Sequence, residues 1–224
     1  MAAFHTSIVA ILLLALIVTL ANAYDPSPLQ DFCVFDNTST VLVNGLACKA
    51  RDKVTAEDFF TSGLNTSTAE AAFPNSTFSA ASVTTIPGLN TLGLTLIRND
   101  YLPGAAIPPH VHSRATELAL VLKGTITLGF VSADPATGYK NNTAYLKECA
   151  EGDVFVVPQG LVHFGQVSSD GDATTITAFN SQNPGFNFVP AQVFGRSLSL
   201  PQGFLAKSFQ VTDQIIEEIQ NHFQ

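Results

Sequence analysis

Two closely spaced histidines and a glutamate form the pattern in this sequence with the clearest chemical potential. His110 and His112 stand two positions apart, and Glu117 follows five positions later. Successive side chains of a β-strand alternate between faces, so the two imidazoles are predicted to point the same way and to bind one ion. Glu117 has the opposite parity. The chain must therefore bulge or bend between Ser113 and Thr116 for the carboxylate to join them.

A second stretch supplies a third imidazole. It runs from Gly152 to His163 and is typical of strand, turn and strand, with Pro158 and Gly160 in the turn. Surface histidines and an unrelated core histidine are the alternative interpretation, but the nearby Glu117, the prolines and the glycines favour a metal site. Three neutral imidazoles and one carboxylate suit a borderline divalent ion, and an octahedral ion keeps two positions for water or substrate.

The N-terminal segment, residues 1–23, is predicted to be a secretory signal peptide. It has no Lys, Arg, Asp or Glu, it is nearly all aliphatic from Ile8 to Leu20, and it ends in the small-x-small pattern Ala21-Asn22-Ala23. A retained membrane anchor is the alternative, although the apolar run is shorter than the ~20 residues that a span needs. We therefore expect a secreted protein with no membrane attachment after the signal is removed.

The remaining chain, residues 24–224, is poor in charge. Lys, Arg, Asp and Glu make up about 14% of it, against ~25% in typical globular proteins. Glycans, or burial of apolar surface between subunits, would keep such a chain soluble, and four sequons are candidates for glycosylation: Asn37, Asn65, Asn75 and Asn141. The net charge of −8 and the lack of a basic run argue against a nucleic-acid partner.

Three cysteines fit an oxidising compartment. Cys33 and Cys48 bracket a short polar segment and are the natural pair there. Closing a loop of that size would stabilise the fold by ~3 kcal/mol on the chain-entropy account. Cys149 is then left as a partly buried free thiol or, alternatively, as an intermolecular bridge.

Short strands dominate the centre of the sequence. We predict strands over 92–96, 117–122, 125–131, 154–157, 161–167 and 174–179, and turns at 133–138 and 170–172. The small polar residues 62–82 are predicted as loop. Such strands indicate an all-β sandwich or barrel, and the absence of repeats indicates a single domain.

Helices are expected only outside this strand-rich part. A short one is predicted over Thr55–Phe60, with Thr55 as N-cap. An amphipathic one begins at Thr212, with Ile215, Ile216, Ile219 and Phe223 on one face. The sequence leaves open whether this terminal helix docks on its own barrel or on a neighbouring subunit.

The two histidine stretches together resemble the paired motifs of the cupin superfamily, and further motifs narrow the resemblance to plant germin-like proteins. The cupin motifs are Gly104-x5-His110-x-His112-x4-Glu117-x6-Gly124 and Gly152-x5-Pro158-x-Gly160-x2-His163. The narrower motifs are Gln30-Asp-Phe-Cys33-Val, Pro108-Pro-His-Val-His-Ser-Arg-Ala-Thr-Glu117 and Phe179-Asn-Ser-Gln-Asn-Pro-Gly185. The resemblance covers essentially all of residues 24–224.

This resemblance implies a specific architecture and cofactor. The fold would be a single cupin jelly-roll β-barrel, with a core at about 60–200 and a C-terminal helical segment at about 203–223. Mn(II) would be bound by His110, His112, Glu117 and His163, with a Cys33–Cys48 disulfide, an apoplastic or cell-wall location, and a homohexamer built as a trimer of dimers. Ligand type alone does not separate manganese, iron and zinc, so the choice of Mn(II) rests on the resemblance.

Oxalate oxidation is the best-known activity of the family. This sequence lacks residues that its oxalate-oxidising members share. Oxalate-oxidising members resemble one another in placing asparagines three and thirteen residues before the first motif histidine, where this chain has Ile107 and Ile97. An amide holds a carboxylate by hydrogen bonds and an isoleucine does not, so oxalate oxidase activity is not expected. Val167 also departs from the family, which often has asparagine four residues after the last histidine.

Superoxide dismutation is the preferred enzymatic hypothesis, with no catalytic residue beyond the metal ligands. Arg114 would supply local positive charge or, alternatively, an ordinary salt bridge; the acidic net charge gives no steering toward superoxide. One alternative is a non-catalytic structural or receptor-type protein of the cell wall, with a role in plant defence. Another is a nucleotide-sugar pyrophosphatase or phosphodiesterase, although no Gly-rich phosphate loop is present.

Overall fold

A computed structural model describes residues 30–41, 46–70, 73–138, 140–195 and 200–223. The predicted signal peptide lies outside these residues. The chain divides into two compact units, Met1–Phe32 and Cys33–Gln224, and the second contains the elements described below.

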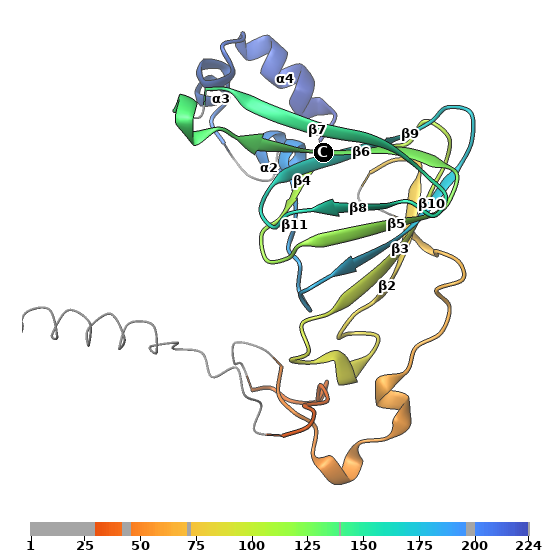
Figure 1. The fold of residues 1–224 in the computed structure, drawn as a ribbon. Coiled ribbons are helices and arrows are strands. Elements are labelled where there is room, and N and C mark those ends of the chain that lie inside the picture. Colours follow the sequence, from red (N-terminus) through yellow and green to blue (C-terminus); the bar gives the residue numbers. More distant parts are fainter. Residues whose placement is uncertain (1–29, 42–45, 71–72, 139, 196–199, 224) are drawn as a thin grey trace, which may run out of the picture. The chain divides into compact units, whose positions relative to one another are not determined.

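Two antiparallel sheets form a jelly-roll (Figure 1). The six-stranded sheet contains, in spatial order, β1 (Ala69–Glu70), β2 (Ser76–Ala81), β3 (Thr95–Tyr101), β10 (Ala173–Phe179), β5 (Glu117–Lys123) and β8 (Val154–Val157). The five-stranded sheet contains β11 (Phe186–Phe188), β4 (Ala106–His112), β9 (Val162–Val167), β6 (Thr125–Ala133) and β7 (Asn142–Ala150). Strands distant in sequence thus become neighbours, as β3 with β10 and β4 with β9.

The apolar core lies between the two sheets. On β5, Ala119 and Val121 are buried while Leu118 and Leu122 are exposed, which is the alternation expected of a strand with one face on the core. The largest cluster of buried side chains consists of Tyr101, Ala105, Ala119, Val121, Ile126, Leu128, Cys149, Val167 and Ala173. A smaller cluster of Ile97, Ala115 and Phe179 lies on the side of the barrel that carries the histidines.

Most predicted strands are confirmed to within two residues, and two predictions are wrong. The strand predicted over 92–96 runs instead over Thr95–Tyr101, because Leu92 and Leu94 are exposed in the preceding turn. The loop predicted over 62–82 contains β1 and β2. Their backbones pair, β1 with β2 and β2 with β3, although their residues show no hydrophobic alternation. The predictions also omitted β7 and β11.

Short helices flank the sheets. The predicted N-terminal helix is the 3₁₀ segment η2 (Ala56–Phe59), with a capping box between Thr55 and Asp58. The other 3₁₀ segments are η1 (Arg51–Lys53), η3 (Pro87–Leu89) and η4 (Pro135–Thr137).

Three α-helices end the chain: α2 (Val189–Phe194), α3 (Gln202–Phe209) and α4 (Asp213–Asn221). Thr212 caps α4 by accepting a hydrogen bond from the backbone of Ile215, as predicted. Ile216 is fully buried against Leu205 of α3, whereas Ile215 is exposed, so the buried face is narrower than expected. No helix in the described ranges is long and apolar enough to cross a membrane.

The predicted disulfide is confirmed. Cys33 and Cys48 form a disulfide, and the flanking backbone is joined to the rest of the fold by the hydrogen bond from Phe35 N to Pro87 O. Cys149 is a buried free thiol on β7.

Candidate metal centre

The four predicted ligand residues come from both sheets. His110 and His112 lie on β4, and His163 on β9 stands directly opposite His110 in the register of the five-stranded sheet. Glu117 is the first residue of β5 in the six-stranded sheet. The turn that follows His112 carries the chain from one sheet to the other, and this bend brings the carboxylate to the imidazoles.

Inside the barrel the four side chains converge. Their ligand atoms all lie within 4.8 Å of one another. Glu117 Oε2 is 3.1 Å from His112 Nε2 and 3.0 Å from His163 Nε2. The histidines are only 7%, 2% and 4% exposed, in the order His110, His112 and His163. Such close packing of potential ligands, away from bulk water, is the geometry that a cation site requires.

Backbone carbonyls orient all three imidazoles. His110 Nδ1 donates to Pro108 O at 2.9 Å, His163 Nδ1 donates to Leu161 O at 2.9 Å, and His112 Nδ1 donates to Gly185 O at 3.3 Å. A carbonyl only accepts, so each Nδ1 carries the proton and each Nε2 presents its lone pair to the common centre.

The carbonyl that orients His112 depends on a glycine. Gly185 has a φ of 76°, and a Cβ there would meet Ser113 Oγ at 2.7 Å and the Arg114 guanidinium at 3.0 Å. Any other residue would strain the backbone in this left-handed region. The motif glycine at position 185 thus has a direct role in positioning a ligand.

Two of the converging ligand atoms have no hydrogen-bond partner in the part of the chain that the structure describes. Despite the short distances, Glu117 Oε2 and His163 Nε2 are buried and, among the described residues, neither makes a hydrogen bond of acceptable geometry. A carboxylate oxygen facing imidazole lone pairs is repulsive unless a cation or a proton lies between them. Three neutral nitrogens and one carboxylate are the donors that a first-row divalent metal accepts, so the residues fit such an ion.

Electrostatics keep two of the ligands, His110 and Glu117, in the protonation states that a metal needs. Burial lowers the pKa of His110 to about 4, and the neighbouring His163 adds to the effect. Burial opposes ionisation of Glu117, but hydrogens shared with His112 and His163 outweigh it in the metal-free protein and bring the pKa of the carboxyl down to about 2, as a cation in their place would. Glu117 is therefore an anion and His110 a neutral donor at pH 7.

A small cavity with both apolar and polar walls includes three of the cluster residues, His110, His112 and Glu117, in its lining. It has a volume of about 60 Å³, and its walls include Ile97 and Ile107. Rings of Phe179 and Phe186 pack edge-on against His112, with centroids 4.7 and 4.5 Å away. The lining also contains three polar residues that the sequence interpretation missed, Asn99, Tyr101 and Thr177. They share the inward parity of Ile97 and of the β10 core positions, which is the signal that would have found them.

The other residues singled out in the sequence lie outside this cavity. Arg114 is exposed and donates to the backbone and side-chain oxygens of Asn183 at 2.8 and 2.7 Å, so it is committed to that loop. Val167 is buried in the core on β9. The four sequon asparagines, Asn37, Asn65, Asn75 and Asn141, are all exposed, and their glycosylation stays a prediction.

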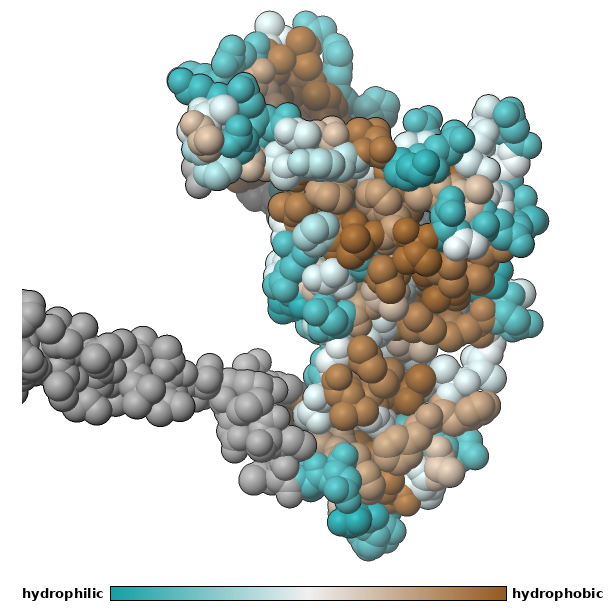
Figure 2. Space-filling view, viewed as in Figure 1, coloured by the Kyte–Doolittle hydropathy of each residue, from teal (hydrophilic) through white to brown (hydrophobic). Residues whose placement is uncertain are grey.

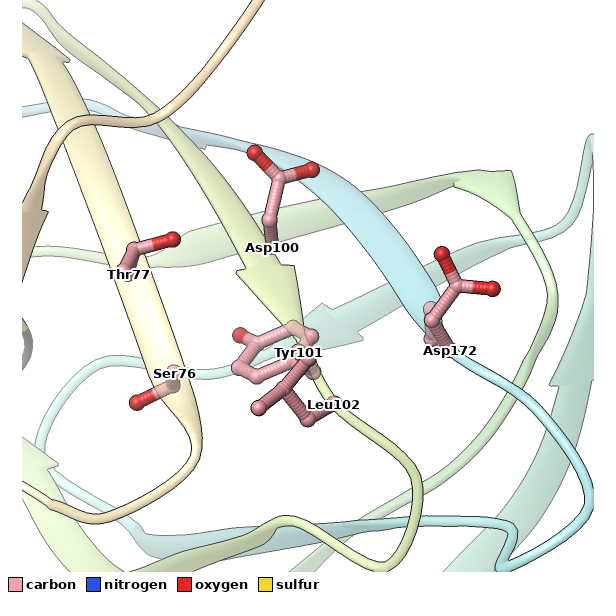
Figure 3. Close-up of a pocket in the computed structure, with 7 residues that line it drawn as sticks. Ser76, Thr77, Asp100, Tyr101, Leu102 and Asp172 are labelled. Atoms are coloured by element: carbon pink, nitrogen blue, oxygen red, sulfur yellow. The ribbon is translucent and has the colours of Figure 1, made fainter.

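A second cavity lies at the end of the six-stranded sheet (Figure 3). Its volume is about 200 Å³, and its lining includes Ser76, Thr77, Asp100, Tyr101 and Asp172. It holds no cluster of metal-binding type. Within the described ranges, the only group of three or more His, Cys, Asp or Glu side chains with suitable geometry is the one on β4, β5 and β9.

A jelly-roll barrel that encloses three histidines and a glutamate defines the class of cupins, and the sequence profile of that family, described as "Cupin", matches residues 62–217. The chain is 45% identical over 219 residues to "Germin-like protein 5-1" of Oryza sativa subsp. japonica, which covers 96% of this chain and 93% of the relative. It is 44% identical over 207 residues to "Germin-like protein subfamily 1 member 6" of Arabidopsis thaliana, covering 92% and 89%. The chain belongs to the germin-like family of cupins.

A solved structure agrees with this assignment. A recombinant oxalate oxidase in complex with glycolate superposes with a TM-score of 0.79 at 37% identity, covering 89% of this chain and 98% of that one. The predicted fold class and family are therefore confirmed.

Proposed function

We propose that this chain is a secreted manganese protein of the apoplast or cell wall, active in defence or stress responses, and that it dismutates superoxide. The observation that carries the proposal is the convergence of His110, His112, Glu117 and His163, with buried ligand atoms that lack other partners. Bound manganese would supply one-electron redox chemistry. The similarity to an oxalate oxidase supports a redox use of the site.

The protein's own residues would favour a small anion. Three neutral imidazoles and one carboxylate leave a divalent ion with a net charge of about +1, which attracts an anion inside a low-dielectric barrel. The cavity of about 60 Å³ holds only a few water-sized groups. Phenylalanine rings on its walls exclude bulk water from the reacting centre.

Oxalate is a poor candidate substrate. Ile97 and Ile107 line the cavity and offer no hydrogen bonds to a second carboxylate. We expect no carbon dioxide or hydrogen peroxide from oxalate with the metal-loaded protein, and turnover of oxalate at the rate of superoxide would contradict the assignment.

A homohexamer, built as a trimer of dimers, is proposed as the working form. Apolar side chains gather over the outer face of β5 and β8, as Figure 2 shows, and Leu118, Leu122, Val154 and Val156 are exposed there. Such a patch on a chain with few charges suits burial against another copy. Light scattering should give six times the mass of one chain, and Val156→Glu should reduce it.

Metal analysis combined with a superoxide assay on the purified oligomer tests the function. The protein should contain manganese and dismutate superoxide, and His112→Ala should abolish both. His222→Ala is the matched control, since it removes an exposed imidazole at the end of α4.

Other outcomes separate the remaining hypotheses. Full metal occupancy without turnover of superoxide would leave a structural or receptor-type role. Phosphate-ester cleavage of a nucleotide sugar by the loaded protein, and not by His112→Ala, would replace dismutation by the phosphodiesterase hypothesis.

A further inference from the structure

Tyr101 lines two cavities, called here the metal cavity, beside the metal ligands, and the outer cavity, at the end of the sheet. The metal cavity has a volume of about 60 Å³ and the outer cavity one of about 200 Å³. Figure 3 shows its ring beside Ser76, with which it pairs across β2 and β3. The outer cavity reaches the surface at Leu102 and Asp172, both of which are exposed. One phenol ring thus separates solvent from the interior of the barrel.

Polar side chains continue inward from this ring. The Tyr101 hydroxyl is hydrogen-bonded to the hydroxyl of Thr175. Asn99 Nδ2 donates to Thr175 Oγ1 at 3.4 Å and to Thr177 Oγ1 at 3.5 Å. Of the threonines, Thr177 lines the metal cavity. The four residues lie on the inward face of β3 and β10. Thr177 is two residue rows from the row that contains Glu117, Thr175 and Asn99 are four rows from it, and Tyr101 is six.

Asn99 determines which way the threonine hydroxyls point. An amide nitrogen only donates, so it occupies a lone pair on each threonine oxygen. The second lone pair of Thr175 can then accept from Tyr101, and the hydroxyl hydrogens of Thr175 and Thr177 are free to point toward the cavity. The result is a directed series of hydroxyls rather than a set of groups that satisfy only themselves.

Packing alone does not account for these residues. Thr175 and Thr177 are 1% and 4% exposed, and the contacts from Asn99 are long. Buried polar groups with weak hydrogen bonds cost stability, and valine and phenylalanine would fill the same space without that cost. Such groups call for an explanation in function or in bound water.

We propose that Tyr101 passes protons between the outer cavity and the metal cavity, through Thr175 and through cavity water held by Thr177, with Asn99 as the positioning residue. In each passage the phenol accepts a proton from water in the outer cavity and releases its own proton toward Thr175. It is neutral before and after, and no electron moves.

Burial suits the phenol to this role. Desolvation raises the pKa of Tyr101 well above its ordinary value, so the hydroxyl keeps its proton and remains a donor. The physiological use rests on the proposed function: two superoxide ions and two protons give one dioxygen and one hydrogen peroxide, so dismutation consumes a proton for each superoxide.

The test compares proton exchange with whole-water exchange on the Mn(II)-loaded protein. Water-proton relaxivity reports protons that visit the metal site and return to bulk solvent, and oxygen-17 relaxation reports entire water molecules. Tyr101→Phe keeps the ring and removes only the hydroxyl. We expect proton exchange to slow by about five-fold, as for one lost hydrogen-bonded step, with oxygen-17 exchange unchanged.

Two further variants make the result specific. Thr175→Val should slow proton exchange in the same way. Tyr145→Phe is the matched control, because it removes a phenol hydroxyl from the exposed face of β7 and should change nothing.

Equal proton and oxygen-17 exchange rates in the unmodified protein, or an unaffected proton rate in both Tyr101→Phe and Thr175→Val, would overturn the proposal. The measurement is independent of turnover. Slowed proton exchange in a protein that does not dismutate superoxide would therefore remove the proposed function and keep the relay.

Discussion

Two buried or partly buried carboxylates, Glu117 in the barrel and Asp100 at the end of the same sheet, have opposite surroundings. Asp100 accepts from Arg98 Nη2 at 2.7 Å and Nε at 2.9 Å, from Thr174 Oγ1 at 2.7 Å, and from the backbone and side chain of Ser67 at 3.0 and 2.5 Å. Glu117 Oε2 faces two imidazole nitrogens that present lone pairs.

The difference lies in what completes each group. Every neighbour of Asp100 is a donor, so the chain itself satisfies the carboxylate and joins the loop at Ser67 to β3 and β10. Every close neighbour of Glu117 is an acceptor in the tautomers that the backbone carbonyls impose. The first arrangement is a finished structural connection, and the second needs a cation. Low pKa values at both carboxyls do not distinguish these roles; the direction of the neighbouring hydrogens does.

The largest effect is expected for metal binding by Glu117→Gln. This change removes the only anionic ligand, so manganese affinity should fall by more than ~100-fold, beyond the loss typical of residues that merely support ligands. Competition with a chelator measures it. Asp100→Asn is the control and should retain the metal content of the unmodified protein per folded chain; loss of metal in both variants would erase the contrast.

The stability of the metal-free protein should depend more on Asp100 than on Glu117, the reverse of the order for metal binding. Asp100→Asn leaves Arg98, only 17% exposed in its side chain, without its counter-charge, and should lower the free energy of unfolding by about 2 kcal/mol. Urea unfolding of the metal-free proteins gives the value. A change under half of that size would show that the Asp100 cluster is not a structural connection.

Acid should remove the contribution of Asp100. Hydrogen bonds from Arg98 hold the pKa of this carboxyl far below its usual range. Because the folded-state pKa is depressed, the stabilisation is complete above the ordinary aspartate pKa of about 4 and is lost as the pH falls below it. The stability gap between the unmodified protein and Asp100→Asn should be constant from pH 8 to 5 and narrow below pH ~4. A gap that persists at the lowest measurable pH would contradict this.

The smallest effect is expected for Glu117→Gln without metal. A neutral amide replaces an anion that faces lone pairs, and it can donate to one of them. At pH 8 the free energy of unfolding of the metal-free protein should rise by less than ~1 kcal/mol. A drop of several kcal/mol on urea unfolding would mean that the chain itself satisfies Glu117, as it does Asp100.

Sequence reasoning succeeded where the pattern was local. The shared face of His110 and His112 follows from strand parity, and the start of α4 follows from the cap at Thr212. It failed where the structure of a segment depends on pairing with a distant strand. The segment of β2 has no hydrophobic alternation and is a strand because it pairs with β3.

The residues that line the metal cavity could not be predicted from local sequence patterns either. Asn99 and Thr177 meet at the same cavity only through the register of β3 with β10, which joins segments far apart in the chain. The three carbonyls that fix the imidazole tautomers are backbone atoms and leave no mark in the residue types.

The origin of the ligands in different layers has a further consequence. Three come from one sheet and the fourth from the other, so a bound ion ties the two halves of the sandwich together where the disulfide does not reach. Under the proposed manganese binding, metal supply would govern how long each molecule endures as well as its activity. Cells starved of the metal would be expected to hold less of this protein even at unchanged rates of synthesis.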